Sequence, residues 1–170
     1  GSATGACSSS DRFVATSSLT KVYGLSGLRC GRILAEPALA ERIWRLNELF
    51  GVSQAHADER LSCIALANLD RISEGTNQLL ARNRALANSL FASRSELDCA
   101  RLAGGITAFP RLVRGDPEAL DRLLREKYDT SIVPGRWFEM PEHFRVGLGG
   151  PTPMIEEGLA RLGRALDELR

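Results

Sequence analysis

A stretch rich in alanine, leucine and arginine, running from Ser53 to about Arg94, places the strongest constraint on the fold. Its apolar residues recur at helical spacing and can form a buried stripe. The stripe comprises Ile64, Leu69, Ile72, Leu79, Leu86 and Leu90. Gly75 interrupts the stretch and marks a bend. Because a helix of this length commonly bridges two lobes, we predict a domain boundary near Gly75.

The segment before this helix combines two short strands with a second helix. The apolar runs Arg12–Ser18 and Gly31–Glu36 are typical of β-strands, and a glycine-containing loop with Lys21 joins them. Pro37 suits the first position of a helix, and Gly51 is well placed to end it.

The segment after the long helix alternates between short strands and helices. We predict a strand at Ile106–Val113, made irregular by its proline, and short strands in residues 130–140 and 143–149 around a Pro-Gly turn. Asp116, as an N-cap, begins one helix, and Thr152 caps the last one. We expect the neighbouring aromatic residues Trp137 and Phe138 to fill the core of this half.

The fold class that follows is α/β, with a small mixed sheet in the second half. Hydrophobic residues make up 44% of the chain and charged residues 25%, which is ordinary for a globular protein. With a formal net charge of +1, the chain lacks the excess of positive charge that is typical of proteins that bind nucleic acid or an anionic membrane. No apolar run is long enough to span a bilayer. We expect neither of these partners.

Cysteine and histidine usage bears on the compartment and on metals. The four cysteines are widely separated, without a C-x-x-C pair, so we predict free thiols and a cytoplasmic location. Only two histidines occur, and we expect no metal site.

Lysine is rare in this chain: it occurs only at Lys21 and Lys127, although 22 residues are basic. Lys21 follows the hydroxyls of Ser18 and Thr20 and precedes a glycine-rich loop that a ligand can approach closely. A partly desolvated lysine has a nucleophilic amine that forms Schiff bases with carbonyl compounds. Arg29 and Ser18 carry the donors that bind a phosphate.

The segment Thr16–Gly31 resembles the cofactor-lysine motif of the class I/II aminotransferases, the fold-type I enzymes that depend on pyridoxal phosphate. The matching residues are Ser18, Leu19, Thr20, Lys21, Gly24, Leu25, Gly27, Arg29 and Gly31. Cys30 stands where an aliphatic residue is usual. The resemblance implies that Lys21 is the internal aldimine lysine and the proton shuttle, and that Ser18 and Arg29 bind the cofactor phosphate.

A second resemblance involves the segment "HFRVGLG", residues 143–149. It is similar to the C-terminal strand on which family members carry an arginine for the substrate α-carboxylate, and Arg145 fills that position. A planar guanidinium binds a carboxylate through two parallel hydrogen bonds and so fixes the substrate's orientation.

The resemblance covers the chain from about Phe13 onward and implies the C-terminal portion of such an enzyme. Residues 1–10 are then a flexible lead with a tag remnant, 11–74 the end of the large cofactor-binding domain, and 75–170 the small domain. Asp11 lies too close to Lys21 to pair with the cofactor's pyridine nitrogen. We therefore expect an aminotransferase that acts on an amino acid and a 2-oxo acid, homodimeric when intact, with the isolated chain inactive.

Three alternatives stay open at this point. The same lysine serves lyases, decarboxylases and synthases of this fold. An aminotransferase-like sensor domain of a transcription regulator binds the cofactor without turnover, but it needs an upstream DNA-binding domain. A fragment without catalytic capacity is the third.

Overall fold

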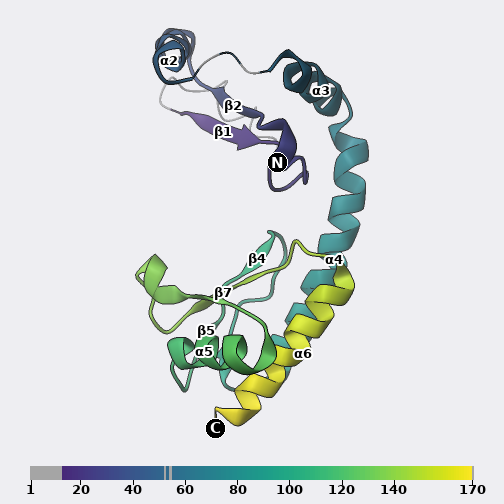
Figure 1. Cartoon of the computed structure of the whole chain (residues 1–170), viewed down its shortest axis with the longest axis vertical. Coiled ribbons are helices and arrows are strands. Elements are labelled where there is room, and N and C mark those ends of the chain that lie inside the picture. The colour runs from purple at the N-terminus through teal and green to yellow at the C-terminus, as the bar shows by residue number, and fades with distance from the viewer. Residues whose placement is uncertain (1–12, 52, 54, 170) are drawn as a thin grey trace. The chain divides into compact units, whose positions relative to one another are not determined.

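A computed structural model describes residues 13–51, 53 and 55–169 of the 170-residue chain. The lead predicted for residues 1–10, with Cys7, and the acidic residue Asp11 lie outside the described residues. The chain divides into two compact units, the first ending at Thr76 and the second beginning at Asn77 (Figure 1). Each unit combines helices with short strands.

The first unit begins with an antiparallel hairpin of β1 (Ala15–Ser18) and β2 (Gly31–Leu34). The loop between the strands contains a short 3-10 helix, η1 (Ser26–Leu28). Helix α2 (Pro37–Phe50) follows and confirms the predicted helix with Pro37 in its first turn and Gly51 at its end. The carboxylate of Glu36 caps this helix, since it accepts hydrogen bonds from the first turn's backbone N–H groups.

The predicted single helix from Ser53 to Arg94 is two helices, α3 (His56–Ala67) and α4 (Leu69–Ser93). The break lies at Asn68 and not at Gly75, which sits inside the continuous helix α4. The side-chain amide of Asn68 donates to the carbonyl of Ile64 at 2.8 Å. Such a local bond offers the backbone an alternative to helix continuation, and the pattern of apolar residues does not reveal it. Helix α4 contributes residues to both units.

Few side chains are buried in the first unit. Among its described residues only Leu19, Ser62 and Ala65 are buried. Helix α2 buries none of its side chains, and four of its large apolar residues are 53–88% exposed. These are Trp44, Leu46, Leu49 and Phe50. The predicted buried stripe is wrong: Ile64 is exposed and its other five residues are only half-buried. The residues that α4 buries are instead Leu80, Asn83, Ala87 and Phe91.

The second unit contains two small antiparallel sheets. One has the strand order β4 (Thr107–Ala108), β7 (Phe144–Gly147), β6 (Val133–Pro134). The other pairs β3 (Leu97–Asp98) with β5 (Arg111–Leu112). The strand predicted at Ile106–Val113 is therefore split between two sheets, around Pro110. A proline cannot donate to a ladder, so its position between the two strands fits its chemistry.

Helices α5 (Pro117–Tyr128) and α6 (Thr152–Glu168) pack together in this unit. Asp116 caps α5 as predicted, because its carboxylate accepts the backbone N–H of Glu118 at 3.0 Å. The prediction that Thr152 caps α6 is wrong. Thr152 is the first helical residue, preceded by Pro151, and no side-chain hydrogen bond caps this end.

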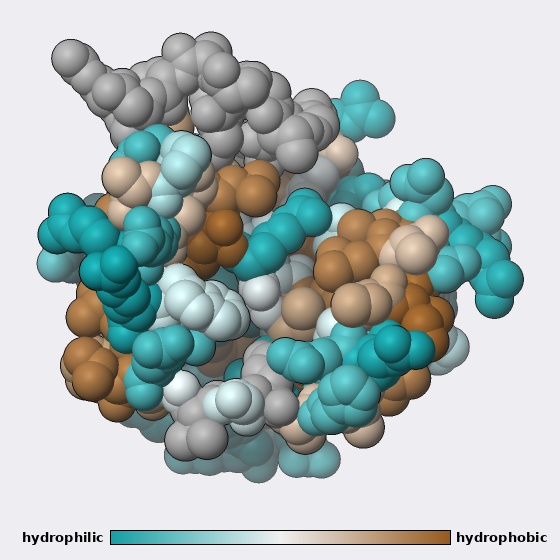
Figure 2. Space-filling view, turned by 90° about the horizontal axis from the view of Figure 1, so that it is seen from above, coloured by the Kyte–Doolittle hydropathy of each residue, from teal (hydrophilic) through white to brown (hydrophobic). Residues whose placement is uncertain are grey.

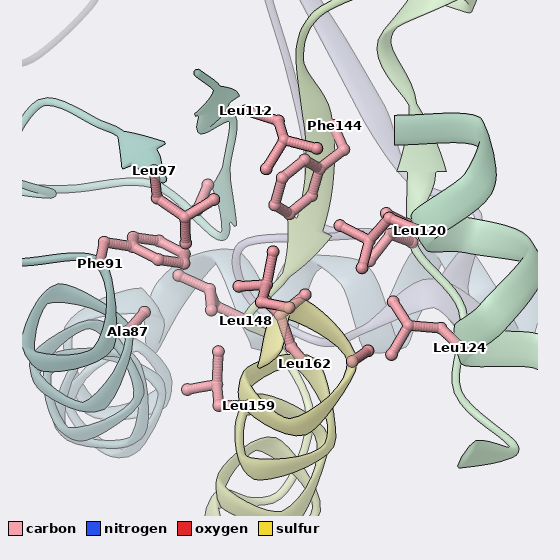
Figure 3. Packing of buried hydrophobic residues seen from close by; sticks show 14 of the residues in the cluster. Ala87, Phe91, Leu97, Leu112, Leu120, Leu124, Phe144, Leu148, Leu159 and Leu162 are labelled. Atoms are coloured by element: carbon pink, nitrogen blue, oxygen red, sulfur yellow. The ribbon is translucent and has the colours of Figure 1, made fainter. Parts of the chain in front are cut away.

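The core of the second unit is a continuous apolar cluster to which α4, α5, α6 and the strands β3, β4, β5 and β7 contribute (Figure 3). Phe144, Leu120 and Leu124 have no exposed surface within it. Trp137 and Phe138 do not belong to the core, contrary to the prediction: their side chains are 68% and 41% exposed. They lie in the short helix η2 (Gly135–Phe138), which turns out of the sheet after β6.

Candidate active site

Lys21 lies in the hairpin loop that joins β1 and β2 and is exposed. Leu19, two residues earlier, is buried and anchors the loop. Its N–H donates to the carbonyl of Cys30 at 3.0 Å, and its own carbonyl accepts the N–H of Leu25 at 3.0 Å. Gly24 adopts a positive φ of 69°, a conformation that glycine takes without steric cost. Local bonds thus fix the course of the lysine loop.

The two predicted phosphate ligands lie at the loop end of the hairpin. Ser18 is the last residue of β1 and pairs with Gly31, the first residue of β2. Arg29 lies two residues before Gly31 and has a left-handed backbone conformation with a φ of 47°. The Ser18 hydroxyl accepts the N–H of Thr20 at 3.4 Å, and the Arg29 guanidinium donates to the carbonyl of Ser26 at 3.3 Å.

A cavity of about 60 Å³ opens beside the hairpin within the first unit. Ser18 lines it, together with two residues that the sequence did not single out for a site role, Tyr23 and Arg32. Leu66 of α3 and Leu69 of α4 form the apolar wall. The side chain of Tyr23 is half-buried.

The two lysines have different surroundings. The ammonium of Lys127 contacts both carboxylate oxygens of Glu168, at 2.7 and 2.8 Å, and this hydrogen bond raises the pKa of Lys127. Lys21 forms no ion pair with any other residue that the structure describes. The partial desolvation expected for Lys21 is not present, because the described residues leave its side chain exposed. Among the described residues, Lys127 is paired with a carboxylate and Lys21 is not.

Arg145 lies on β7, in the second unit, whereas Ser18, Lys21 and Arg29 all belong to the first. Its strand neighbour Phe144 points into the core, so the alternation along the strand leaves Arg145 exposed. Its guanidinium lies 5.2 Å from the ring centre of Phe138. Within the described ranges no carboxylate pairs with it. The sequence did not reveal the contact with Phe138, because that residue was assigned to the core.

The thiols and the potential metal ligands give two further findings. Cys30, Cys63 and Cys99 are free, as predicted, and Cys7 lies outside the described residues. The part of the chain that the structure describes holds no cluster of three histidine, cysteine or acidic side chains that could bind a metal ion. None of its helices combines the length and hydropathy that crossing a lipid bilayer requires.

Residues 5–162 match the family described as aminotransferase class I and II. The match extends over most of the chain and includes the lysine hairpin and β7. The chain belongs to this family.

Three known proteins illustrate the likeness. Capreomycidine synthase from Streptomyces vinaceus is 30% identical over 158 residues, which cover 92% of this chain and 41% of that protein. The structure of a PLP-dependent aminotransferase from Streptococcus suis superposes with a TM-score of 0.89 at 23% identity, covering 94% of this chain and 43% of that one. The PLP-dependent cyclase OrfR superposes with a TM-score of 0.82 at 27% identity, covering 91% and 43%.

These superpositions show that the chain has the fold-type I aminotransferase fold over somewhat less than half the length of its relatives. The coarse prediction of an α/β aminotransferase portion is thereby confirmed. The relatives include both an aminotransferase and a cyclase, so the fold does not by itself define the reaction.

Proposed function

We propose that this chain supplies the cofactor lysine and the substrate-binding arginine of a pyridoxal-phosphate-dependent enzyme that transfers an amino group from an amino acid to a 2-oxo acid. The observation that carries the proposal is the hairpin of a class I/II aminotransferase chain, whose loop holds Lys21 in the sequence between Ser18 and Arg29. Since the chain spans 41% of capreomycidine synthase, we infer that the complete enzyme needs further residues and that the isolated chain does not turn over substrate.

The residues of the hairpin fit the chemical groups of the cofactor. An aldehyde requires an amine, and Lys21 offers one that no described carboxylate engages. A phosphate requires hydrogen-bond donors, and the hydroxyl of Ser18 and the guanidinium of Arg29 lie at the same end of the hairpin. When bound, pyridoxal phosphate supplies an electron sink for the electrons released at the substrate α-carbon.

The roles of the protein's own residues follow from this arrangement. Lys21 holds the cofactor through its Nζ and then carries a proton to and from the substrate α-carbon. Ser18 and Arg29 hold the phosphate. Arg145 binds the α-carboxylate bidentately, which fixes the α-carbon bond that is broken. The exposed guanidinium without a described carboxylate partner supports this role of Arg145.

A synthase or cyclase reaction is the second candidate. The identity of 30% to capreomycidine synthase favours it. The two reactions share Lys21 and Arg145 and differ in what happens after the α-proton is removed. Product analysis distinguishes them: an aminotransferase yields a 2-oxo acid from the amino donor and a new amino acid from the acceptor, whereas a cyclase retains the substrate nitrogen in a ring.

Two further features of the complete enzyme belong to the proposal. We infer a homodimer in which a second subunit or further residues cover the apolar side chains of α2, which are exposed here. We place the enzyme in the cytoplasm because Cys30, Cys63 and Cys99 are free thiols, which is typical of a reducing compartment.

Trapping the cofactor with borohydride tests the assignment of Lys21. The chain is incubated with increasing pyridoxal phosphate, reduced, digested and mapped by mass spectrometry. We expect saturable labelling of the peptide that contains Lys21 and its loss in Lys21→Ala, with labelling retained in the control Lys127→Ala. Equal, unsaturable labelling of both lysines would contradict the assignment.

A further inference from the structure

We propose that Phe138 is a positioning residue that holds the Arg145 guanidinium ready for the substrate carboxylate. The inference rests on the proposed function of Arg145 and adds a residue to it. It starts from an unexpected placement, since a large aromatic side chain predicted for the core lies 41% exposed beneath an arginine.

The contact has the geometry of a cation–π interaction. The guanidinium carbon of Arg145 lies over the Phe138 ring, 5.2 Å from its centre, inside the roughly 6 Å range in which the ring quadrupole attracts a cation. A ring beneath the guanidinium attracts it without using any of its N–H donors. The donors that a carboxylate needs therefore stay available.

A chain of aromatic contacts orients the Phe138 ring. Phe109 meets this ring edge-on, with centres 5.4 Å apart and planes at 81°. Phe109 in turn stacks on His143, with centres 5.0 Å apart and planes at 16°. His143 precedes Arg145 by two residues, so the series of contacts begins and ends beside β7. Edge-on and offset stacks are the favoured arrangements of aromatic pairs.

Backbone hydrogen bonds hold the loop that carries Phe138 in place. The N–H of Gly135 donates to the carbonyl of His143 at 2.7 Å, and the carbonyl of Gly135 accepts the N–H of Met140 at 3.0 Å. A side chain at position 135 would lie 2.5 Å from the His143 oxygen and closer still to that of Met140. An ion pair between Arg136 and Glu118 ties the loop to α5. The loop thus offers Phe138 a fixed base.

Fixing the arginine before the substrate arrives has an energetic consequence. A free arginine side chain loses rotamer freedom when it binds a carboxylate, and this loss weakens binding. A guanidinium already held over a ring loses less. Removal of the ring should weaken carboxylate binding about two- to five-fold, as expected for a cation–π contact at an exposed site.

The neighbouring residue supplies a matched control. Trp137 makes the same kind of contact with Arg136, whose guanidinium lies 4.7 Å from the tryptophan ring centre. Arg136 is already paired with Glu118. Trp137→Leu therefore removes an aromatic ring from the same loop without removing the one under Arg145.

The first experiment examines the contact itself in the 170-residue chain. The Nε–Hε resonance of Arg145 is assigned by nuclear magnetic resonance from its loss in Arg145→Leu. We expect Phe138→Leu to remove a ring-current shift from this resonance, while Phe138→Tyr and Trp137→Leu leave it in place. A resonance that does not move in Phe138→Leu would contradict the proposal.

The second experiment measures carboxylate recognition in the complete enzyme. KM and kcat are compared for L-alanine and for L-alaninamide, which lacks the carboxylate. We expect Phe138→Leu to raise the KM for L-alanine about two- to five-fold with little change in kcat. The KM for the amide should not change. Phe138→Tyr should restore the wild-type KM, and Trp137→Leu should retain it.

The outcomes separate this inference from the proposed function. If Arg145→Leu leaves the preference for L-alanine over its amide intact, the role of Arg145 is wrong and the inference fails with it. If Arg145→Leu abolishes the preference but Phe138→Leu does not reduce it, the role of Phe138 alone is wrong. If Phe138→Leu loses its fold, turnover of both substrates falls equally. The KM of Phe138→Tyr for L-alanine then tests the inference, because this variant keeps an aromatic ring under Arg145.

Discussion

The two units of the chain differ in how they are held together. The second unit has a closed apolar core with Phe144, Leu120 and Leu124 fully buried. The first unit holds its lysine hairpin through backbone hydrogen bonds around Leu19, and apolar residues of α2 reach the surface. Apolar side chains are visible between polar ones on the face shown in Figure 2.

The difference bears on the proposed chemistry. The hairpin that carries Ser18, Lys21 and Arg29 arises locally, because it depends on strand pairing and turn bonds between Ala15 and Leu34. The desolvation that makes an amine nucleophilic depends on what covers it. The described residues supply the hairpin geometry but do not desolvate the Lys21 amine. We therefore infer that other residues of the complete enzyme cover Lys21.

The largest expected effect contrasts one buried with one exposed side chain. Phe144→Ala should lower the free energy of unfolding by about 3–5 kcal/mol, since it leaves a cavity in a packed core. Leu49→Ala, at a site that is 76% exposed on α2, should change it by less than about 0.5 kcal/mol. Urea unfolding followed by circular dichroism gives both values.

Amide hydrogen exchange then shows in which of the two units each variant loses stability. A similar loss for the two variants would mean that Leu49 is buried in solution by another copy of the chain. The contrast between the units would then be wrong, and dilution should reverse the effect of Leu49→Ala.

A smaller effect is expected at the two capped helices. Asp116→Ala removes the cap of α5, whose Leu120 belongs to the core, and should cost about 1 kcal/mol of global stability. Glu36→Ala removes the cap of α2, which buries no side chain. We expect this second loss to speed amide exchange in α2 while the urea midpoint of the second unit stays in place. A shift of that midpoint by Glu36→Ala would contradict independent stabilities.

The sequence predicted those parts of the fold that depend on neighbouring residues. Pro37 and Gly51 bound α2, Asp116 starts α5, and the lysine hairpin forms where its motif indicates. The break at Asn68 was not predicted, since it depends on a side-chain bond that competes with the helix.

Placement that depends on distant contacts was predicted less well. The sequence predicted Phe138 as a core residue because its side chain is large and apolar. In the structure its ring contacts Phe109, which is distant in the sequence, and Arg145 on β7. The sequence likewise indicated Lys21 through its motif and could not give its exposure, which depends on residues elsewhere in the fold. The hairpin and the starts of α2 and α5 were therefore predictable here, whereas the environment of the side chains was not.

The smallest effect is expected from the ion pair that distinguishes Lys127 from Lys21. Hydrogen bonds from Lys127 and then Tyr128 lower the pKa of Glu168 from its usual 4.5, and the bond to Glu168 raises the pKa of Lys127 above 10.5. A lowered carboxylate pKa stabilises the fold above pH 4.5, and this contribution is lost as the pH falls through the folded-state value. The raised pKa of Lys127 stabilises the fold below pH 10.5, and this contribution is lost as the pH rises through the folded-state pKa of the lysine.

The difference in unfolding free energy between the wild type and Glu168→Gln should therefore be constant around neutral pH and should disappear at both low and high pH. Because the pair is exposed, added salt should reduce it. Urea unfolding across the pH range checks this, and a difference that persists well below pH 4.5 would assign the effect of Glu168→Gln to packing and not to charge.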